Sequence, residues 1–544
     1  MVSLFNALNI SSNALTVNES AINVVSHNVA NMNTEGYSKQ RVHLATRNIS
    51  GAIGDNVTAQ IRANGGVMIA NVMRYNDSYL NNYYRDQLSI LKEYEEKLGN
   101  IGDLADIFDD LEGKGISDAI ANFYDAVNNL NEYPASSTAR VNFIESAKTL
   151  TATLNAKSVQ LDELNAKALG DGVSREALEN SKIYNQFEIF NNKLEELAEC
   201  NKALAVTQTG SLEANNLLDQ RDMILNDIAE FVDINIDEKQ NGSVDLYVGG
   251  VAMVKGAVVT GELEIKTASE YCAAQNPPIN YPADWVTADG KPRENAVISI
   301  VNNSGETSQV VVSDANSIIN TGALGGMLHS ADLDADGMNV GVAQDKLNQI
   351  SQAIADVFNT LNTREGAYYI NPNDTSSLAT GNNVNIFNVD ANGKTSAGTI
   401  SVNEALLGED GCWMLACAYF DPKSGTTPDL RAVGNAQNVI AMLQTRNTQM
   451  DGLENRPDLN GMTIEEAYTS LLGKIAASGS NGQALVDTQQ NVVDSVYNQI
   501  KSNNSVDLNE ELVDLVKYQT AYSAAAQVFN TCNNCLNTLM TLGG

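Results

Sequence analysis

Residues 4–32 read LFNALNISSNALTVNESAINVVSHNVANM, and residues 508–540 read LNEELVDLVKYQTAYSAAAQVFNTCNNCLNTLM. In both segments apolar residues recur every three or four positions, the heptad pattern that seats one α-helix against another. A lone helix cannot bury such a narrow stripe. We therefore expect the two ends of the chain to pair with each other or with further subunits, as in an assembly protein rather than an enzyme.

The subunit contacts are expected at the apolar members of the two stripes. These are Leu4, Leu8, Leu15, Ile22, Val25, Val29, Leu508, Leu512, Leu515, Tyr522, Phe529 and Leu536. Four polar residues interrupt the stripes, namely Ser11, Asn18, Gln519 and Asn533. Either they reject wrong registers, because a mismatched pairing would bury them without a partner, or they face solvent or a channel.

The composition argues against several classes of partner. The chain has 544 residues, enough for several domains, and a formal net charge of −34. Nucleic acid and an anionic membrane surface would repel it. No run of 18 apolar residues predicts a transmembrane helix. The first basic residue is Lys39, so we expect no Sec-type signal peptide: the protein stays in the cytoplasm or leaves by a route that reads no such signal.

Helical periodicity dominates residues 76–230. The stripes predict helices over 80–98, over 116–130 until Pro134, over 141–154 with Ser136 or Ser137 as cap, and over roughly 177–204. Before them, residues 37–75 are polar and rich in glycine, and we expect extended segments there with strands at 57–61 and 67–72.

The period changes from helix to strand at about residue 231. Residues 232–236 and 244–248 alternate around Asn241-Gly242, a hairpin-turn sequence, and residues 297–301 and 310–312 flank a similar turn. Helix is expected again over about 327–362. A second β-rich or irregular insert covers 367–430, and helices return from 432 onward.

This order predicts an α+β, elongated, multidomain protein whose chain leaves one base and returns to it. The expected divisions are a terminal domain of residues 1–36 with 505–544, where the terminal helices form a coiled coil; a helical-bundle domain of 37–230 with 315–366 and 431–504; an outer β-rich insert at 231–314; and a second at 367–430.

No group of residues predicts catalysis, a metal or a cofactor. HExxH, GxSxG and Walker A sequences are absent, and His27 is better explained by packing or hydrogen bonding. Residues 332–337, DLDADG, copy the start of a calcium loop, but Ala343 stands where a bidentate glutamate is needed. We interpret this segment as a solvated acidic helix start and residues 390–393 as a turn. Cys532 and Cys535 lack a second pair or a βαβ context, and we interpret them as helix-packing residues.

Several segments resemble a known family. Residues 23–38, NVVSHNVANMNTEGYS, are similar to the N-terminal signature of the bacterial flagellar axial proteins of rod, hook and hook-associated type. Residues 506–512, VDLNEEL, with YQTAY at 518–522 and AQV at 526–528, resemble the C-terminal signature. Within the chain, NLLDQRD at 216–222, NTGALGGML at 320–328 and AGTISVNEAL at 397–406 resemble the FlgK-type hook-associated protein 1 family. The resemblance is weak in the two inserts.

The resemblance implies a structural, non-enzymatic protein of the hook–filament junction that serves flagellum assembly and motility. It implies export through the flagellar type III channel and an extracellular place at the hook tip. The implied partners are copies of itself in a ring, the hook protein, a second junction protein, and a cytoplasmic export chaperone at the C-terminal helix. The terminal helices would pack around the central channel, and the inserts would face solvent.

Two alternative functions remain open. Another axial protein, such as the hook or a distal rod protein, shares the terminal signatures, but the interior segments argue against it. A secreted adhesin or calcium-binding surface protein would use the inserts instead.

Overall fold

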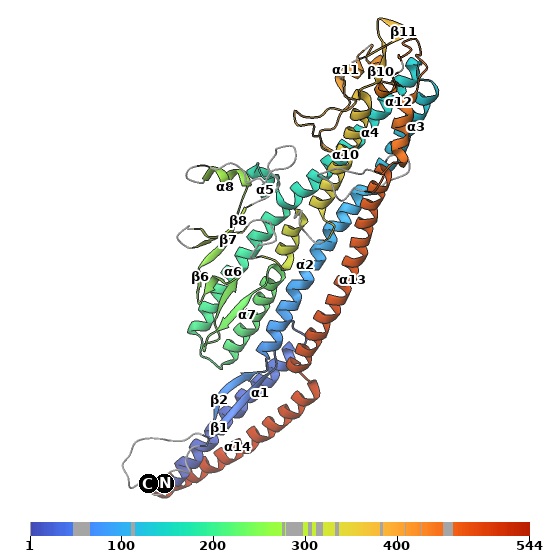
Figure 1. Ribbon diagram of the computed structural model, residues 1–544. Helices are drawn as coiled ribbons and strands as arrows, with labels where there is room; N and C mark the ends of the chain where they lie inside the picture. Colours follow the sequence, from blue (N-terminus) through green and yellow to red (C-terminus); the bar gives the residue numbers. More distant parts are fainter. Residues whose placement is uncertain are drawn as a thin grey trace.

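The protein is a long rod whose two chain ends lie together at one tip (Figure 1). The computed structural model describes the chain except for residues 1, 47–65, 110–114, 275–277, 279–296, 303–306, 312–318, 332–336, 381–383, 409, 426, 450–460 and 544. In the described part no helix is both long and apolar enough to cross a membrane.

The thin end of the rod, which we call the stalk, consists of two helices and a β-ribbon. Its elements are α1 (Val2–Asn31), α14 (Leu508–Gly543), β1 (Gln40–Thr46) and β2 (Val67–Arg74). The two helices pack against each other along their length and run in opposite directions (Figure 1). The antiparallel ribbon β1–β2 lies against α1, where Val42 packs on Ala21 and Val24. The predicted pairing of the two chain ends is therefore confirmed.

Two long helices form the spine of the remaining part, the body. Helix α2 (Ser78–Phe108) packs against α13 (Ile464–Asn504), and the short α9 (Gly322–Leu328) also contacts α2. The Asp77 side chain caps α2 by accepting a hydrogen bond from the Leu80 N–H, and Thr463 with Glu466 forms a capping box at the start of α13. Because α13 ends at Asn504 and α14 begins at Leu508, three residues separate body from stalk on this side.

The body has two hydrophobic cores. The core far from the stalk is formed mainly by α3 (Ile116–Glu132), α4 (Ser137–Leu169) and α10 (Val340–Thr363). The rings of Phe123 and Phe358 pack edge to face there, with their centroids 4.9 Å apart, which is a favourable aromatic geometry. Predicted helices at 116–130 and 141–154 are confirmed, and Ser136 is the cap of α4.

The core nearer the stalk joins helices to sheet. The core is built on α5 (Arg175–Glu179), α6 (Lys182–Val206), α7 (Leu212–Phe231), β3 (Asn235–Glu238), β4 (Val244–Val248), β5 (Val251–Lys255), β6 (Val258–Val259) and β7 (Gly261–Lys266). The elements that follow in the chain are α8 (Ala268–Ala274), β8 (Val297–Asn302) and β9 (Thr307–Val311). Strands β3 to β6 form one antiparallel sheet and β7 to β9 another. The predicted hairpin at Asn241-Gly242 joins β3 to β4, with Gly242 at a φ of 84°.

The second insert completes the far core. Its elements are β10 (Ala367–Asn371), β11 (Asp374–Ala379), α11 (Glu404–Leu407), η4 (Gly411–Met414), β12 (Ala418–Tyr419) and η5 (Pro422–Ser424), followed by α12 (Gln437–Gln444) and η6 (Thr445–Asn447). Phe387 and Ile400 are fully buried among residues of α3, α4 and α10. This segment is therefore anchored in the helical body rather than only facing solvent.

Some expected elements differ from the structure. The helix predicted over 327–362 is interrupted, because α9 ends at Leu328, the 3₁₀-helix η3 (His329–Ala331) follows, and α10 begins at Val340. The Asn339 side chain accepts a hydrogen bond from the Val342 N–H and so starts a new helix there. Strand β1 was not predicted, whereas 67–72 is part of β2. The strand expected at 57–61 and the calcium-like residues 332–336 lie outside the described residues.

Candidate assembly site and its junction with the body

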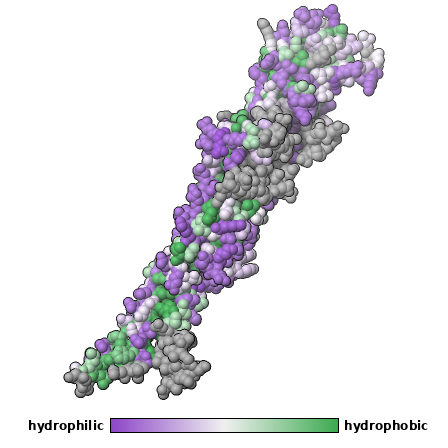
Figure 2. Space-filling model, turned by 90° about the vertical axis from the view of Figure 1, so that its left-hand side faces the viewer, coloured by the Kyte–Doolittle hydropathy of each residue, from purple (hydrophilic) through white to green (hydrophobic). Residues whose placement is uncertain are grey.

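The stalk leaves apolar side chains exposed after its own two helices have paired. Val17, Ala21, Val24 and Val25 of α1 are buried, and Tyr518 of α14 packs against the cluster of Ala21, Val24 and Val42. In contrast, Leu512, Val513 and Val516 at the start of α14 are 46%, 67% and 61% exposed. Figure 2 shows hydrophobic residues gathered at the stalk end, whereas the body surface is mostly hydrophilic. Apolar surface of this extent is typical of a protein interface.

The structure divides the twelve predicted contact residues into three groups. Val25 is buried; Leu4, Leu8, Leu15, Ile22, Val29, Leu515, Phe529 and Leu536 are half-buried; and Leu508, Leu512 and Tyr522 are exposed. The sequence stripe of α14 thus combines residues that face α1 with residues that point away from it. Sequence reasoning missed Val17, Ala21 and Val24, which are buried; Ala21 and Val24 are covered by the ribbon on a side of α1 that the stripe did not include.

The polar residues within the stripes do not pair with one another across the helices. Ser11 is buried, and its hydroxyl donates to the carbonyls of Ala7 and Leu8 in its own helix. The Asn18 amide likewise donates to the carbonyl of Ala14. Gln519 and Asn533 are exposed, which agrees with the alternative that they face solvent.

Asn28 is the hub that joins α1 to the ribbon and to α14. Its amide nitrogen donates to the Gln40 carbonyl at 2.8 Å and to Glu511 Oε2 at 3.0 Å, and its amide oxygen accepts from the Gln40 N–H and the Tyr37 hydroxyl. His27 Nδ1 lies 3.0 Å from the same Tyr37 hydroxyl, so the expected hydrogen-bonding role of His27 is confirmed. These bonds satisfy every polar atom of the buried Asn28 side-chain amide.

Lys39 fixes the start of α14. Its Nζ lies 2.5 Å from Glu510 Oε2 and 3.3 Å from Glu511 Oε1. Burial alone would lower the pKa of Lys39, but the two carboxylates outweigh it and raise the pKa above its usual value. The hydrogen bond from Lys39 in turn lowers the pKa of Glu510. The pair is therefore charged at neutral pH.

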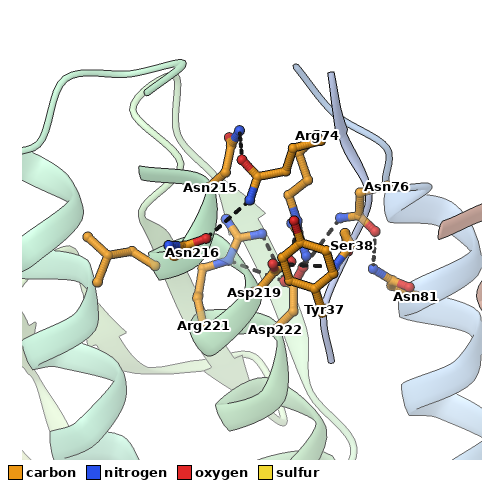
Figure 3. A network of polar contacts seen from close by, with 12 residues as sticks. Tyr37, Ser38, Arg74, Asn76, Asn81, Asn215, Asn216, Asp219, Arg221 and Asp222 are labelled. Atoms are coloured by element: carbon orange, nitrogen blue, oxygen red, sulfur yellow. Dashed lines mark hydrogen bonds and ion pairs between the residues drawn. The ribbon is translucent and has the colours of Figure 1, made fainter. Parts of the chain in front are cut away.

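A buried ionic cluster, the junction cluster, connects the ribbon to the body (Figure 3). Arg74 at the end of β2 contacts Asp219 at 2.6 Å and Asp222 at 2.7 Å, both on α7. Arg85 of α2 and Arg221 of α7 also contact Asp222, at 3.2 Å and 2.9 Å. All five side chains are at most 10% exposed. One carboxylate on α7 thus links three elements.

The two carboxylates of the junction cluster are shifted in opposite directions. Burial would raise the pKa of Asp222, but Arg74, Arg221 and Arg85 overcome it and hold this pKa well below its usual range. Burial dominates at Asp219 and raises its pKa despite Arg74 and the Ser38 N–H, which donates to Asp219 Oδ2. The buried charges of the cluster thus pair with one another, and the cluster holds the ribbon to the body.

Hydrogen bonds of amide side chains also connect the ribbon to α7. Gln40 of β1 donates from Nε2 to Asn216 Oδ1 and accepts at Oε1 from the Asn215 amide. The Asn215 amide also donates to the Val72 carbonyl of β2. Both ribbon strands are therefore tied to α7, and the stalk is held to the body by side chains as well as by the chain.

Gly36 allows the turn between α1 and the ribbon to sit close to α7. Its φ is +75°, and a Cβ there would lie 2.5 Å from Met223 Sδ. A residue with a side chain would therefore strain the backbone here and would force the Met223 side chain to move.

The described residues offer no group of histidine, cysteine and carboxylate side chains able to hold a metal ion. Asp390 accepts the N–H groups of Asn392 and Lys394, which confirms the turn expected at 390–393. Cys532 and Cys535 are free thiols. Cys532 is half-buried, whereas Cys535 is exposed.

The sequence of the chain is similar to known flagellar proteins along its whole length. Family models match at residues 8–37 (flagella basal body rod protein), 101–369 (flagellar hook-associated protein FlgK helical domain) and 502–542 (flagellar basal body rod FlgEFG protein C-terminal). Flagellar hook-associated protein 1 of Bacillus subtilis (strain 168) is 23% identical and aligns over 100% of both chains. Its counterparts of Salmonella typhimurium and Escherichia coli K12 are also 23% identical, over 98% of this chain and 99% of theirs.

The chain belongs to the flagellar hook-associated protein 1 family. It is a structural protein of the flagellar hook–filament junction, in a family that self-polymerises and interacts with other flagellar proteins. The flagellar hook junction protein FlgK of Burkholderia pseudomallei has a similar fold, with a TM-score of 0.54 and 13% identity over 78% of this chain and 100% of that one.

Two interior segments that resembled this family have clear structural roles. Residues 216–222 are the part of α7 that carries the junction cluster. Residues 320–328 include α9, which packs on α2; a Cβ on Gly326 would lie 2.8 Å from the Glu93 carbonyl, so only glycine permits this approach. At these positions the segments that resemble the family hold structural elements together: α7 is joined to the ribbon, and α9 packs on α2.

Proposed function

We propose that the protein builds its junction layer by packing the exposed apolar residues of α14 against the stalks of neighbouring copies. The observation that carries this proposal is that Leu508, Leu512, Val513 and Val516 stay exposed although α14 is already paired with α1. Burying each such side chain in a neighbour would contribute about 1–2 kcal/mol, and the contacts recur for every copy.

The stalk has little stability of its own before assembly. Its described apolar cluster has three buried members, Ala21, Val24 and Val42, and Val17 and Val25 are buried nearby, whereas each body core is far larger. Helices with narrow stripes are marginal in water. Assembly on a template that presents matching helices thus completes the packing of the stalk and restricts polymerisation to the growing tip.

The partners proposed for the two sides of the layer are the hook protein and a second junction protein. We also infer export through the flagellar type III channel, with a chaperone that covers the C-terminal helix until export, and an extracellular location. The exposed apolar residues of α14 support a chaperone, because such a surface favours aggregation in a free subunit.

Deletion of the gene in its host tests the place of the protein. Electron microscopy should show hooks without filaments, and unpolymerised flagellin should appear in the medium. Missing hooks would move the protein to the rod or hook, and normal filaments would refute an axial role.

A substitution tests the surface itself. Leu512→Asp should leave the purified subunit folded, because Leu512 is 46% exposed and belongs to neither body core, but should abolish incorporation at hook tips. Leu430→Asp is the matched control, because Leu430 of the second insert is also 46% exposed. Normal incorporation of Leu512→Asp would contradict the proposed surface.

A further inference from the structure

Four large side chains stay exposed where the ribbon passes into α2. They are Met73, Tyr75, Tyr79 and Tyr83, with exposed fractions of 51%, 43%, 78% and 40%, and we call them the tyrosine surface. Tyrosine and methionine are enriched in protein interfaces, where they bring a large apolar contact area. The tyrosine surface is therefore a candidate interface beside the exposed apolar residues of α14, which we call the α14 surface and which are Leu508, Leu512, Val513 and Val516.

The local geometry turns the tyrosine surface outward. Met73 and Tyr75 alternate with Arg74 along the chain, and because Arg74 points into the junction cluster, its two neighbours point away from it. On α2, the Asn81 amide donates to Asn76 at the junction and is only 9% exposed (Figure 3). The two tyrosines of α2 stand two residues before and after Asn81, about 160° away around the helix.

The tyrosine surface and the α14 surface lie at the same level of the rod. The Lys39 N–H donates to the carbonyl of Asn504, the last residue of α13, at 3.0 Å. The Tyr75 N–H in turn donates to the Lys39 carbonyl at 2.9 Å. Lys39 thus connects the end of the ribbon that carries the tyrosine surface with the point where the chain passes from α13 into α14.

The two surfaces face in opposite directions. Arg41 is the cross-strand partner of Met73, and a hydrogen bond with Tyr75 raises the pKa of Arg41 above its usual value. The same Arg41 lies 3.8 Å from Asp514 of α14. On an α-helix Val516 points about 160° away from Asp514, so the α14 surface lies on the far side of α14. In Figure 1 the ribbon and α14 likewise lie on either side of α1.

The distribution of charge favours contacts between copies at this end of the rod. Residues 76–504 hold 27 basic and 60 acidic residues, whereas residues 1–75 and 505–544 together hold 6 and 7. Two copies that lie side by side therefore repel each other through their bodies and very little through their stalks. Attraction between copies is expected at the stalk end, where both apolar surfaces lie.

Members of the family self-polymerise, and a ring or helical layer needs two different surfaces on each copy, because one surface meets a different surface of the next copy. We propose that the α14 surface of each copy packs on the tyrosine surface of the next copy. This inference rests on the proposed assembly through α14 and names the surface that receives it. The phenol rings cover the aliphatic side chains, while their hydroxyl groups stay in contact with water at the edge.

The test places complementary charges on the two surfaces. Tyr79 and Val513 are 78% and 67% exposed, so substitutions there should leave the subunit folded. Tyr79→Glu and Val513→Lys should each lower the amount of protein on purified hook structures about tenfold or more, because each buries a lone charge against apolar side chains. The double variant Tyr79→Glu, Val513→Lys should recover about fivefold over either single variant, because the two charges then meet at every contact.

The matched control is the double variant Tyr79→Lys, Val513→Lys, which carries charges of equal sign at the same positions and should not recover. The reversed pair Tyr79→Lys, Val513→Glu should recover, and it provides an independent test should one of the other substitutions disturb folding. Tyr133→Glu, at a residue 58% exposed just after α3, should be incorporated normally. Circular dichroism of the purified subunits checks the fold of every variant.

Normal incorporation of Tyr79→Glu would overturn the proposal, and so would equal amounts of the opposite-charge and equal-charge double variants on hooks. Failure of the proposed assembly surface is detected separately, as normal incorporation of Leu512→Asp. If only the present inference fails, Leu512→Asp stays excluded from hooks while Tyr79→Glu is incorporated.

Discussion

At the scale of single residues, Asp222 forms ion pairs with more partners than any other side chain of the junction cluster. It accepts contacts from Arg74, Arg85 and Arg221, which come from β2, α2 and α7. A buried carboxylate surrounded by three guanidinium groups is stabilising only while it is present, because its removal leaves buried positive charges uncompensated. The junction therefore depends on this one residue more than on any surface pair.

Asp222→Asn should lower the free energy of unfolding by about 3–5 kcal/mol, measured by urea denaturation of the purified chain. The matched control is Asp227→Asn on the same helix, where the carboxylate is 51% exposed and forms an ion pair with Lys193 at 3.1 Å. That control should change stability by less than about 1 kcal/mol. Equal effects of the two variants would refute the special role of Asp222.

The pH dependence of the same effect has a definite sign. Because the pKa of Asp222 is lower in the folded than in the unfolded protein, its contribution is present above the ordinary value of 3.8 and is lost as pH falls below it. The stability difference between wild type and Asp222→Asn should therefore be constant from pH 7 to about 5 and shrink below about pH 4. Denaturation curves across this range measure it; a difference that disappears already near pH 6 would contradict the assignment.

At the scale of elements, α14 combines an internal seam with an external surface. Phe529 is half-buried toward α1, whereas Val528, its neighbour in sequence, is 50% exposed. Residues one position apart on a helix point in directions about 100° apart, so the two functions can be altered separately.

Phe529→Ala should loosen α14 in the isolated subunit, because it removes about half of a large side chain from contact with α1, at a cost of about 2 kcal/mol. Hydrogen exchange of backbone amides in residues 508–543 should accelerate by more than tenfold. Val528→Ala should leave exchange unchanged and affect assembly only. Faster exchange in both variants would mean that both faces already have partners within the subunit.

At the scale of the whole molecule, the stalk and the body are separate packing units. Neither body core contains a residue of the stalk. The two parts are connected through the junction cluster, the amides of α7, the packing of Leu212 on the stalk cluster, the backbone bond from Val72 to Gly210, and two chain crossings. This division lets the stalk pack against its neighbours while the body keeps its own fold. We propose it in place of the four divisions expected from the sequence, because both inserts share cores with body helices.

A chain truncated to residues 76–504 should therefore fold as a stable body. We expect it to keep its helical circular dichroism signal and cooperative thermal unfolding, with a modest loss from the missing Arg74. Small-angle scattering should give a shorter rod than the full chain. An unfolded or aggregated fragment would show that the stalk contributes to the stability of the body.

The sequence by itself determined the terminal helices, the positions of most body helices and the hairpin at Asn241-Gly242, because periodicity, caps and turn residues act locally. Its terminal and interior signatures also indicated the family. Only the tertiary structure decided which side of α14 meets α1, because one stripe of apolar residues serves two interfaces and periodicity cannot separate them. The junction cluster could not be predicted from the sequence either. Asp222 lies far in sequence from Arg74 and Arg85, and no local pattern indicates that three elements bring these residues together.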